Sequence, residues 1–107
     1  MGYRSDVAIF LTNACYVRHK VLENLFPELI KEFDKSMHKN GVLYEMNGVK
    51  WYDSYQDVQQ VYEWLEQLDD EEYGFIRIGE ETEDIEYRGS PGEFGLYINR
   101  DICFEEW

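Results

Sequence analysis

Residues 3–11 read Tyr-Arg-Ser-Asp-Val-Ala-Ile-Phe-Leu and alternate between two faces along their whole length. Val7, Ile9 and Leu11 fall on one face with Tyr3 and Ser5, at the two-residue period of a β-strand. Valine, isoleucine and phenylalanine also fit the pleated, half-buried surface of a sheet. We therefore expect the first strand of the fold over residues 3–11.

A helix is expected next. Two acceptable N-caps follow the strand at 12–13, and apolar residues then recur at three- and four-residue steps as far as Phe33. An interior proline loses a hydrogen bond and clashes with the preceding turn, so Pro27 predicts a kink or a break near Phe26. The His-Lys-Asn-Gly stretch at 38–41 is typical of a helix C-terminus.

The strongest local signal in the chain is Asn47-Gly48, which lies between residues 42–46 and 49–52. Asn-Gly favours a type I′ turn, and we therefore expect a two-stranded hairpin over residues 42–52. A second helix should follow, with Ser54 as its N-cap and Asp57 completing a weak capping box. Its expected apolar stripe is Val58, Val61, Tyr62, Leu65 and Leu68.

The second half of the chain is predicted to be mostly strand. Residues 73–78 and 84–88 should form a second hairpin, with Ile85 and Tyr87 facing inward and the charged residues of that strand facing outward. A last strand is expected from Phe94 to Ile98, with a possible extension to Phe104.

The order of elements, β-α-β-β-α-β-β-β, predicts an α+β fold. Hairpin-connected strands with two intervening helices indicate an antiparallel sheet of about five to six strands with two main helices packed on one face. The length of 107 residues suits one domain, 1–107. An apolar content of 44%, including 18 aromatic residues, is enough for a core and argues against disorder.

The net charge of −13 limits the classes of partner. It excludes ordinary nucleic-acid binding through phosphates and disfavours adsorption to anionic lipid. No stretch approaches the roughly 18 apolar residues of a membrane-spanning helix, and the start of the chain does not resemble a signal peptide. The expectation is a soluble intracellular protein with no membrane partner.

The charge is concentrated in the second half of the chain. Residues 53–107 contain 17 acidic residues against three arginines, whereas residues 1–52 are nearly balanced. Such an asymmetry is informative about partners rather than about fold. Four consecutive acids at 69–72 follow the second helix, where the helix dipole prefers cations, so they should cost stability.

These acids define the candidate partner-binding site. Alternate residues of a strand stand about 6.8 Å apart, so a row such as Asp84 and Glu86 could follow a phosphate track at about half density. Trp64 lies off the predicted apolar stripe and is expected to be a partly exposed anchor. The alternatives are a merely solubilising face and contacts with another kind of protein. The proposed residues are Asp69, Asp70, Glu71, Glu72, Glu80, Glu81, Glu83, Asp84, Glu86 and Trp64.

No residue pattern points to an enzyme. Cys15 and His19 lie one helical turn apart, but no orienting third group is evident, so we assign no catalytic residue. Cys15 and Cys103 are interpreted as reduced thiols. Two Cys and two unclustered His fall short of a zinc site, and the acids near residue 80 lack the spacing of a calcium loop. We expect no metal and no cofactor.

Four stretches carry a resemblance to known proteins. Met1-Gly2-Tyr3-Arg4-Ser5-Asp6-Val7, together with residues 50–55, 73–80 and 96–100, is similar to a family of small bacteriophage and prophage proteins with an MGYRSDV-type N-terminus. The resemblance spans nearly the whole chain and implies a phage setting, in which small acidic proteins often inhibit host defence. It implies no activity or catalytic residue.

The leading hypothesis is a phage-encoded, anti-CRISPR-like inhibitor in the cytoplasm of the infected host. It would bind a CRISPR effector, restriction enzyme or other nuclease at a basic groove, by mimicking nucleic-acid phosphates. The alternative is a small phage scaffold or assembly protein that self-associates through sheet edges and exposed aromatics, with the charge serving only solubility. The sequence leaves open whether the protein is a monomer or a homodimer.

Overall fold

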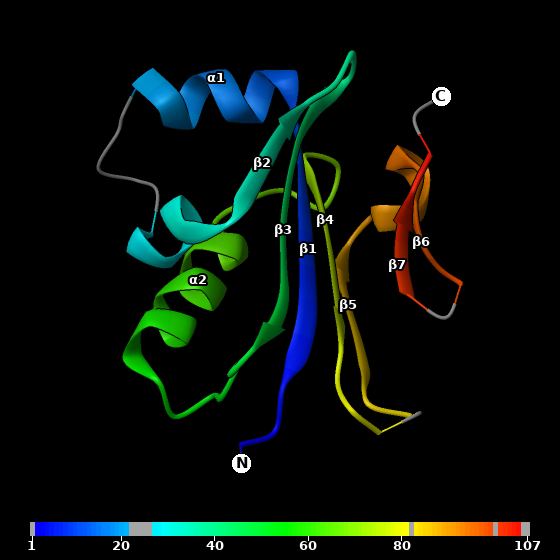
Figure 1. The fold of residues 1–107 in the computed structure, drawn as a ribbon. Coiled ribbons are helices and arrows are strands. Elements are labelled where there is room, and N and C mark those ends of the chain that lie inside the picture. The colour runs from blue at the N-terminus through cyan, green and yellow to red at the C-terminus, as the bar shows by residue number, and fades with distance from the viewer. Residues whose placement is uncertain (1, 22–26, 82, 100, 106–107) are drawn as a thin grey trace.

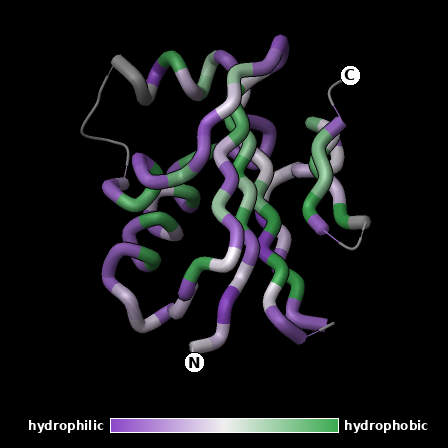
Figure 2. The backbone as a smooth tube through the Cα atoms, viewed as in Figure 1, coloured by the Kyte–Doolittle hydropathy of each residue, from purple (hydrophilic) through white to green (hydrophobic). Residues whose placement is uncertain are grey.

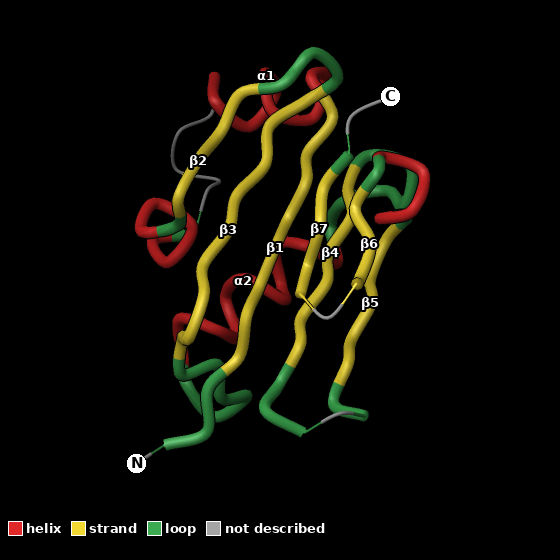
Figure 3. Tube along the Cα trace, turned by 45° about the vertical axis from the view of Figure 1, so that its right-hand side comes forward, coloured by secondary structure: helices red, strands yellow, loops and turns green. Residues whose placement is uncertain are grey.

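The central strand of the molecule is β1 (Ser5–Thr12), close to the expected position. In this computed structural model, which describes residues 2–21, 27–81, 83–99 and 101–105, β1 lies in the middle of a five-stranded antiparallel sheet of order β2-β3-β1-β4-β5 (Figures 1 and 3). The other strands are β2 (Asp34–Met37), β3 (Gly41–Val49), β4 (Tyr73–Ile78) and β5 (Ile85–Gly89). The structure confirms the α+β class.

Both faces of β1 are buried, which explains its dense apolar sequence. Val7, Ile9 and Leu11 point to one side and Ala8 and Phe10 to the other, and each is at most 1% exposed. Because successive side chains of a strand point to opposite faces, β1 contributes side chains to two cores, one on each side of the sheet. Figure 2 shows hydrophobic and hydrophilic positions interleaved along the strands.

The larger core lies between the sheet and the helices. Helix α2 (Gln56–Glu66) and the short 3₁₀ helix η2 (Glu28–Glu32) cover one face, and α1 (Asn13–Val21) lies near one end of the sheet (Figure 1). The first helix is shorter than expected. Residues 22–26, which include the predicted break, lie outside the described residues, and Pro27 is the N-cap of η2.

The smaller core lies on the opposite face, beneath a hairpin that was predicted as one strand. The strand expected from Phe94 toward Phe104 is instead the end of η3 (Pro91–Phe94) followed by two strands, β6 (Leu96–Asn99) and β7 (Asp101–Phe104). The ring of Phe10 stacks on those of Phe94 and Phe104, with centroids 5.1 and 5.4 Å away. The sheet is thus covered on both faces, with two helices on one side and the β6–β7 hairpin on the other.

Asn47-Gly48 does not form the predicted hairpin. Strand β3 runs straight through this dipeptide, and the register with β1 shifts by one residue between Ser5 and Val7. Gly48 takes the left-handed conformation (φ 65°), and its N–H donates to the Asp6 carboxylate at 2.9 Å. Asn47-Gly48 therefore forms a β-bulge in β3, because β3 and β1 continue to pair beyond this dipeptide.

The strand β2 was not predicted. Residues 34–37 were expected to precede a helix stop, but they pair with β3. The His38 N–H donates to the Gly41 carbonyl at 2.8 Å, so residues 38–41 form the tight turn between β2 and β3 rather than a helix C-terminus. Similarly, Ser54 is not a helix cap. The N-cap of α2 is Tyr55, which makes no side-chain cap bond.

Candidate functional site

The hairpin of β4 and β5 is confirmed, but its two faces are opposite to the prediction. Ile85 and Tyr87 are 39% and 58% exposed, whereas Glu86 and Arg88 turn toward the helix side of the sheet. The register explains the reversal, because Arg77 pairs with Glu86 across the two strands and directs its side chain to the same face. The acids of β5 therefore meet a cation instead of solvent.

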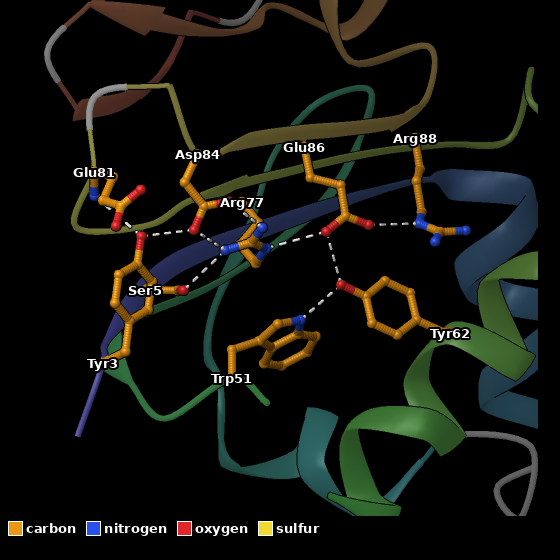
Figure 4. A network of polar contacts seen from close by, with 9 residues as sticks. All are labelled: Tyr3, Ser5, Trp51, Tyr62, Arg77, Glu81, Asp84, Glu86 and Arg88. Atoms are coloured by element: carbon orange, nitrogen blue, oxygen red, sulfur yellow. Dashed lines mark hydrogen bonds and ion pairs between the residues drawn. The ribbon is translucent and has the colours of Figure 1, made fainter. Parts of the chain in front are cut away.

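Arg77 is the centre of this polar network (Figure 4). Its Nη2 donates to Asp84 Oδ1 at 2.6 Å and its Nε donates to Glu86 Oε1 at 3.0 Å. Its Nη1 also donates to Ser5 Oγ at 3.1 Å. Tyr3 completes the Asp84 end, donating its hydroxyl to Oδ2 at 2.6 Å. One guanidinium thus joins β1, β4 and the start of β5.

Glu86 accepts three hydrogen bonds within the molecule. Besides Arg77, Arg88 Nε donates to its Oε2 and the Tyr62 hydroxyl to its Oε1, both at 2.9 Å. Trp51 Nε1 in turn donates to the Tyr62 hydroxyl at 2.9 Å, and the Arg88 guanidinium lies 4.4 Å from the centre of the Tyr62 ring. This chain of contacts fastens α2 to the edge of the sheet.

The electrostatics of the network favour charged carboxylates. Hydrogen bonds from Arg77 and Tyr3 lower the pKa of Asp84 to about 2. Burial disfavours the charged form of Glu86, but donors on Arg88, Arg77 and Tyr62 outweigh it and lower its pKa too. Burial raises the pKa of Tyr62 to about 12, so its hydroxyl stays a donor.

The predicted phosphate-like row of Asp84 and Glu86 is therefore wrong. Both carboxylates are charged, but Arg77 and Arg88 neutralise them at 2.6 to 3.0 Å. The charged residues of this strand were predicted to face solvent because the alternation of apolar residues indicated that Ile85 and Tyr87 face inward. The ion pairs depend on the strand register, which that alternation does not determine.

The turn between β4 and β5 carries the other predicted acids of this hairpin. Glu80 Oε2 accepts the backbone N–H of Arg4 at 3.0 Å, and the Glu81 N–H donates to the Tyr3 hydroxyl at 3.0 Å. The side chains of Glu80, Glu81 and Glu83 are exposed. This turn holds the N-terminal segment as well as presenting charge.

The acids after α2 divide into two kinds. Glu72 forms a bidentate ion pair with Arg18 of α1, at 2.8 and 2.7 Å, and thereby links α1 to the turn that precedes β4. Asp69, Asp70 and Glu71 are exposed, and the structure shows no ion pair for them within the described residues. Only these three of the four keep the surface charge that was predicted.

A long run of exposed acids lies on α2 and the residues that flank it. Residues 53–71, which we call the α2 acidic segment, contain seven acids and no Lys, Arg or His. All seven are exposed and none appears in the ion pairs of the described residues. They are Asp53, Asp57, Glu63, Glu66, Asp69, Asp70 and Glu71.

A cavity of about 360 Å³ opens between α2 and β5. Asp53, Glu63 and Glu66 contribute acids to its wall, and Tyr62 and Gln59 line it as well, together with the Glu86–Arg88 pair. Gln59, Glu63 and Glu66 are spaced by four and three residues, which puts them on one face of a helix. This spacing is visible in the sequence, where Glu63 and Glu66 are separated by Trp64 and Leu65 and therefore do not form a run of consecutive acids.

Trp64 is not an exposed anchor. Its side chain is 4% exposed and belongs to the larger core with Val61 and Leu65. Tyr62, which was expected in that stripe, is only partly buried and makes the polar contacts described above. The helix is therefore rotated slightly from the predicted orientation, since a tyrosine can satisfy its hydroxyl at the boundary and an indole fills the core.

Cys15 is a thiol of the larger core. It is buried, and its burial raises the thiol pKa to about 11, which is unfavourable for a nucleophile. The side chain of His19 lies outside the described residues. Among the described residues no group of three or more His, Cys, Asp or Glu side chains is arranged to hold a metal ion.

Comparisons with other proteins add no family or template to these observations. None of the helices that the structure describes has the length and apolar character needed to span a membrane. The chain matches no protein-family model, no curated protein and no solved structure.

Proposed function

We propose that this chain is a phage-encoded acidic inhibitor that binds a nucleic-acid-handling defence complex in the cytoplasm of a bacterial host. The observation that carries this proposal is the α2 acidic segment, with seven exposed acids and no base. Neighbouring carboxylates one helical turn apart lie about 5–6 Å from each other at their Cβ atoms. Such a surface is complementary to a groove whose Lys and Arg normally contact phosphates.

The cost of this charge supports a role in binding. Asp69, Asp70 and Glu71 follow the C-terminus of α2, whose last turn has no basic residue. Negative charge there opposes the helix dipole and typically costs a few tenths of a kcal/mol to about 1 kcal/mol per group. Elsewhere Arg18, Arg77 and Arg88 neutralise Glu72, Asp84 and Glu86. The α2 acidic segment forms no such ion pair among the described residues.

The proposed target class is a CRISPR effector, a restriction enzyme or another nuclease, and the test uses purified examples of each. Binding of a fluorescent DNA or RNA substrate is measured while the chain is titrated in. The proposal predicts displacement of nucleic acid that weakens as salt rises from about 0.1 to 0.5 M, because screening shortens the range of charge attraction. Failure to bind any member of such a panel at low salt would remove its support.

A matched pair of variants separates specific binding from bulk charge. The α2 variant neutralises four acids of the segment, and the distal variant neutralises four acids on other elements, so that both change the net charge equally. Displacement should be lost in the first and kept in the second. The α2 variant is Glu63→Gln, Glu66→Gln, Asp69→Asn and Asp70→Asn, and the distal variant is Glu32→Gln, Asp34→Asn, Asp101→Asn and Glu105→Gln.

A further inference from the structure

The outer edge of β5 is an unpaired strand edge. β5 is the last strand of the five-stranded sheet, and its five residues contain no proline or lysine, which commonly protect such edges. The opposite edge, β2, is shorter and carries the exposed residues Asp34 and Lys35. β5 instead exposes Ile85 and Tyr87 on the face away from the helices.

The backbone groups available at this edge follow from the β4–β5 ladder. The Gly79 N–H donates to the Asp84 carbonyl at 2.7 Å, and the Ser90 N–H donates to the Tyr73 carbonyl at 2.9 Å. Hydrogen-bonded pairs alternate along an antiparallel ladder, so Glu86 and Arg88 also bond inward to β4. The N–H and C=O of Tyr87 therefore point outward from the sheet, together with the Gly89 N–H and the Ile85 carbonyl.

The sequence of β5 is complementary to itself about Tyr87. Glu86 precedes this residue and Arg88 follows it, so a second antiparallel copy centred at Tyr87 places Glu86 opposite Arg88 of the other chain. Tyr87 would then exchange both backbone hydrogen bonds with its counterpart, and the Gly89 N–H would donate to the Ile85 carbonyl across the seam. This register aligns outward-pointing donors with outward-pointing acceptors on both chains.

This register also places side chains of opposite charge close together across the seam. Glu86 and Arg88 would occupy non-hydrogen-bonded positions, where facing Cα atoms are only about 4.5 Å apart and side chains are closest. Arg88 uses its Nε for its own Glu86, and no hydrogen bond of its two terminal amino groups is seen within the described residues. These amino groups, on a side chain that is 36% exposed, can reach the carboxylate of the other copy.

We propose that two copies of this chain pair through β5 about a two-fold axis at Tyr87, joining their sheets into one ten-stranded antiparallel sheet. The partner at this edge is a second copy because, in an antiparallel pair, the Glu of each Glu-Tyr-Arg segment lies opposite the Arg of the other. The pairing adds an oligomeric interface to the proposed function and does not depend on it. Since each chain carries a net charge of −13, the pairing strengthens as salt screens the repulsion between copies.

The test is sedimentation equilibrium of the full chain in about 0.5 M salt, where the Debye length is only a few ångströms. The wild type should dimerise, and Tyr87→Pro should weaken the dimer by at least about tenfold by removing two edge hydrogen bonds without removing a bond to β4. Tyr87→Glu, which places two carboxylates face to face, should do the same if the proline variant fails to fold. Tyr97→Glu is the control, because Tyr97 is 40% exposed on β6, away from the edge.

Disulfide trapping checks the register directly. In a Cys103→Ser background, Tyr87→Cys should oxidise to a covalent dimer at least about ten times faster than Tyr97→Cys, because facing Cα atoms at the two-fold are about 5.5 Å apart. A wild type that remains monomeric into the millimolar range would overturn the proposal, as would equal trapping rates at the two positions. Failure of nucleic-acid displacement with dimerisation intact would instead count only against the proposed function.

Discussion

Arg77 on β4 and Glu86 on β5 face each other across the strand pair, and the Nε–Oε1 hydrogen bond between them is 3.0 Å long. Arg77 also binds Asp84, which directly precedes β5. Asp84 and Glu86 are structural acids, because they bind arginines that hold the sheet and α2 together. The acids of the α2 acidic segment form no ion pair among the described residues, and their exposed carboxylates are available to a partner.

Replacing Arg77 should be the most damaging single change in the polar network. Arg77→Met leaves Asp84 and Glu86 without their shared cation, and breaking a partly buried pair of this kind costs about 2–4 kcal/mol. Arg88→Met, which removes a more exposed partner of Glu86, should cost about 1 kcal/mol or less. Urea unfolding followed by circular dichroism measures both, and an equal loss in the two variants would contradict the central role of Arg77.

Asp84 should make stability depend on pH in the acidic range. Its pKa is lowered from 3.8 to about 2 in the folded chain, so the unfolded chain takes up the proton first as pH falls. The stabilisation is therefore complete above about pH 4 and is lost progressively toward pH 2. Asp84→Asn lacks this contribution, and the difference in unfolding free energy between wild type and variant should shrink from pH 5 to pH 2.5. A constant difference would be inconsistent with the lowered pKa.

Neutralising the acids after α2 should stabilise the fold. The triple change Asp69→Asn, Asp70→Asn and Glu71→Gln removes negative charge from a helix C-terminus and should raise the unfolding free energy by about 0.5–1 kcal/mol at low salt. The gain should fade in about 1 M salt. The triple change Asp34→Asn, Asp101→Asn and Glu105→Gln provides the comparison at equal net charge, and a loss of stability in the Asp69–Glu71 variant would show that these acids make structural contacts.

Two glycines with positive φ should respond differently to alanine. Gly48 has φ 65° and open space where a Cβ would lie, so Gly48→Ala should cost only the left-handed conformation, about 1–2 kcal/mol. Gly89 has φ 69°, and its added Cβ would collide with the Tyr73 carbonyl oxygen. Gly89→Ala should therefore cost clearly more than Gly48→Ala. Thermal unfolding of both variants measures this difference. A lower melting temperature for Gly48→Ala than for Gly89→Ala would contradict the prediction.

Local patterns in the sequence predicted the strands whose own residues carry a clear strand signal. The alternation of residues 3–11 identified β1, and residues 73–78 were predicted with the bounds of β4. Asn47-Gly48 misled because the same dipeptide suits a hairpin turn and a bulge, and the length of the paired strands decides between them. The polar sequence of β2 offered no strand signal, since its position follows from pairing with β3.

The candidate site was predicted in outline only. The excess of acids in the second half was plain from composition, and Asp69, Asp70 and Glu71 keep the exposure expected of them. Which acids are neutralised depends on strand register and helix rotation, and the sequence does not determine these without the tertiary contacts. Glu86 shows the effect of register, because it turns to the face opposite to the predicted one. Trp64 shows the effect of helix rotation, because it was expected to be partly exposed and is buried.

The most direct measurement is the displacement of labelled nucleic acid from a purified defence nuclease by the wild type, the α2 variant and the distal variant at about 0.1 M salt. The account predicts that the wild type and the distal variant displace nucleic acid with similar midpoints. The α2 variant, which has the same net charge as the distal variant, should need at least about tenfold more protein, as expected when charged contacts at the centre of an interface are lost. Equal midpoints for the two variants would contradict the claim that residues 53–71 form the binding surface.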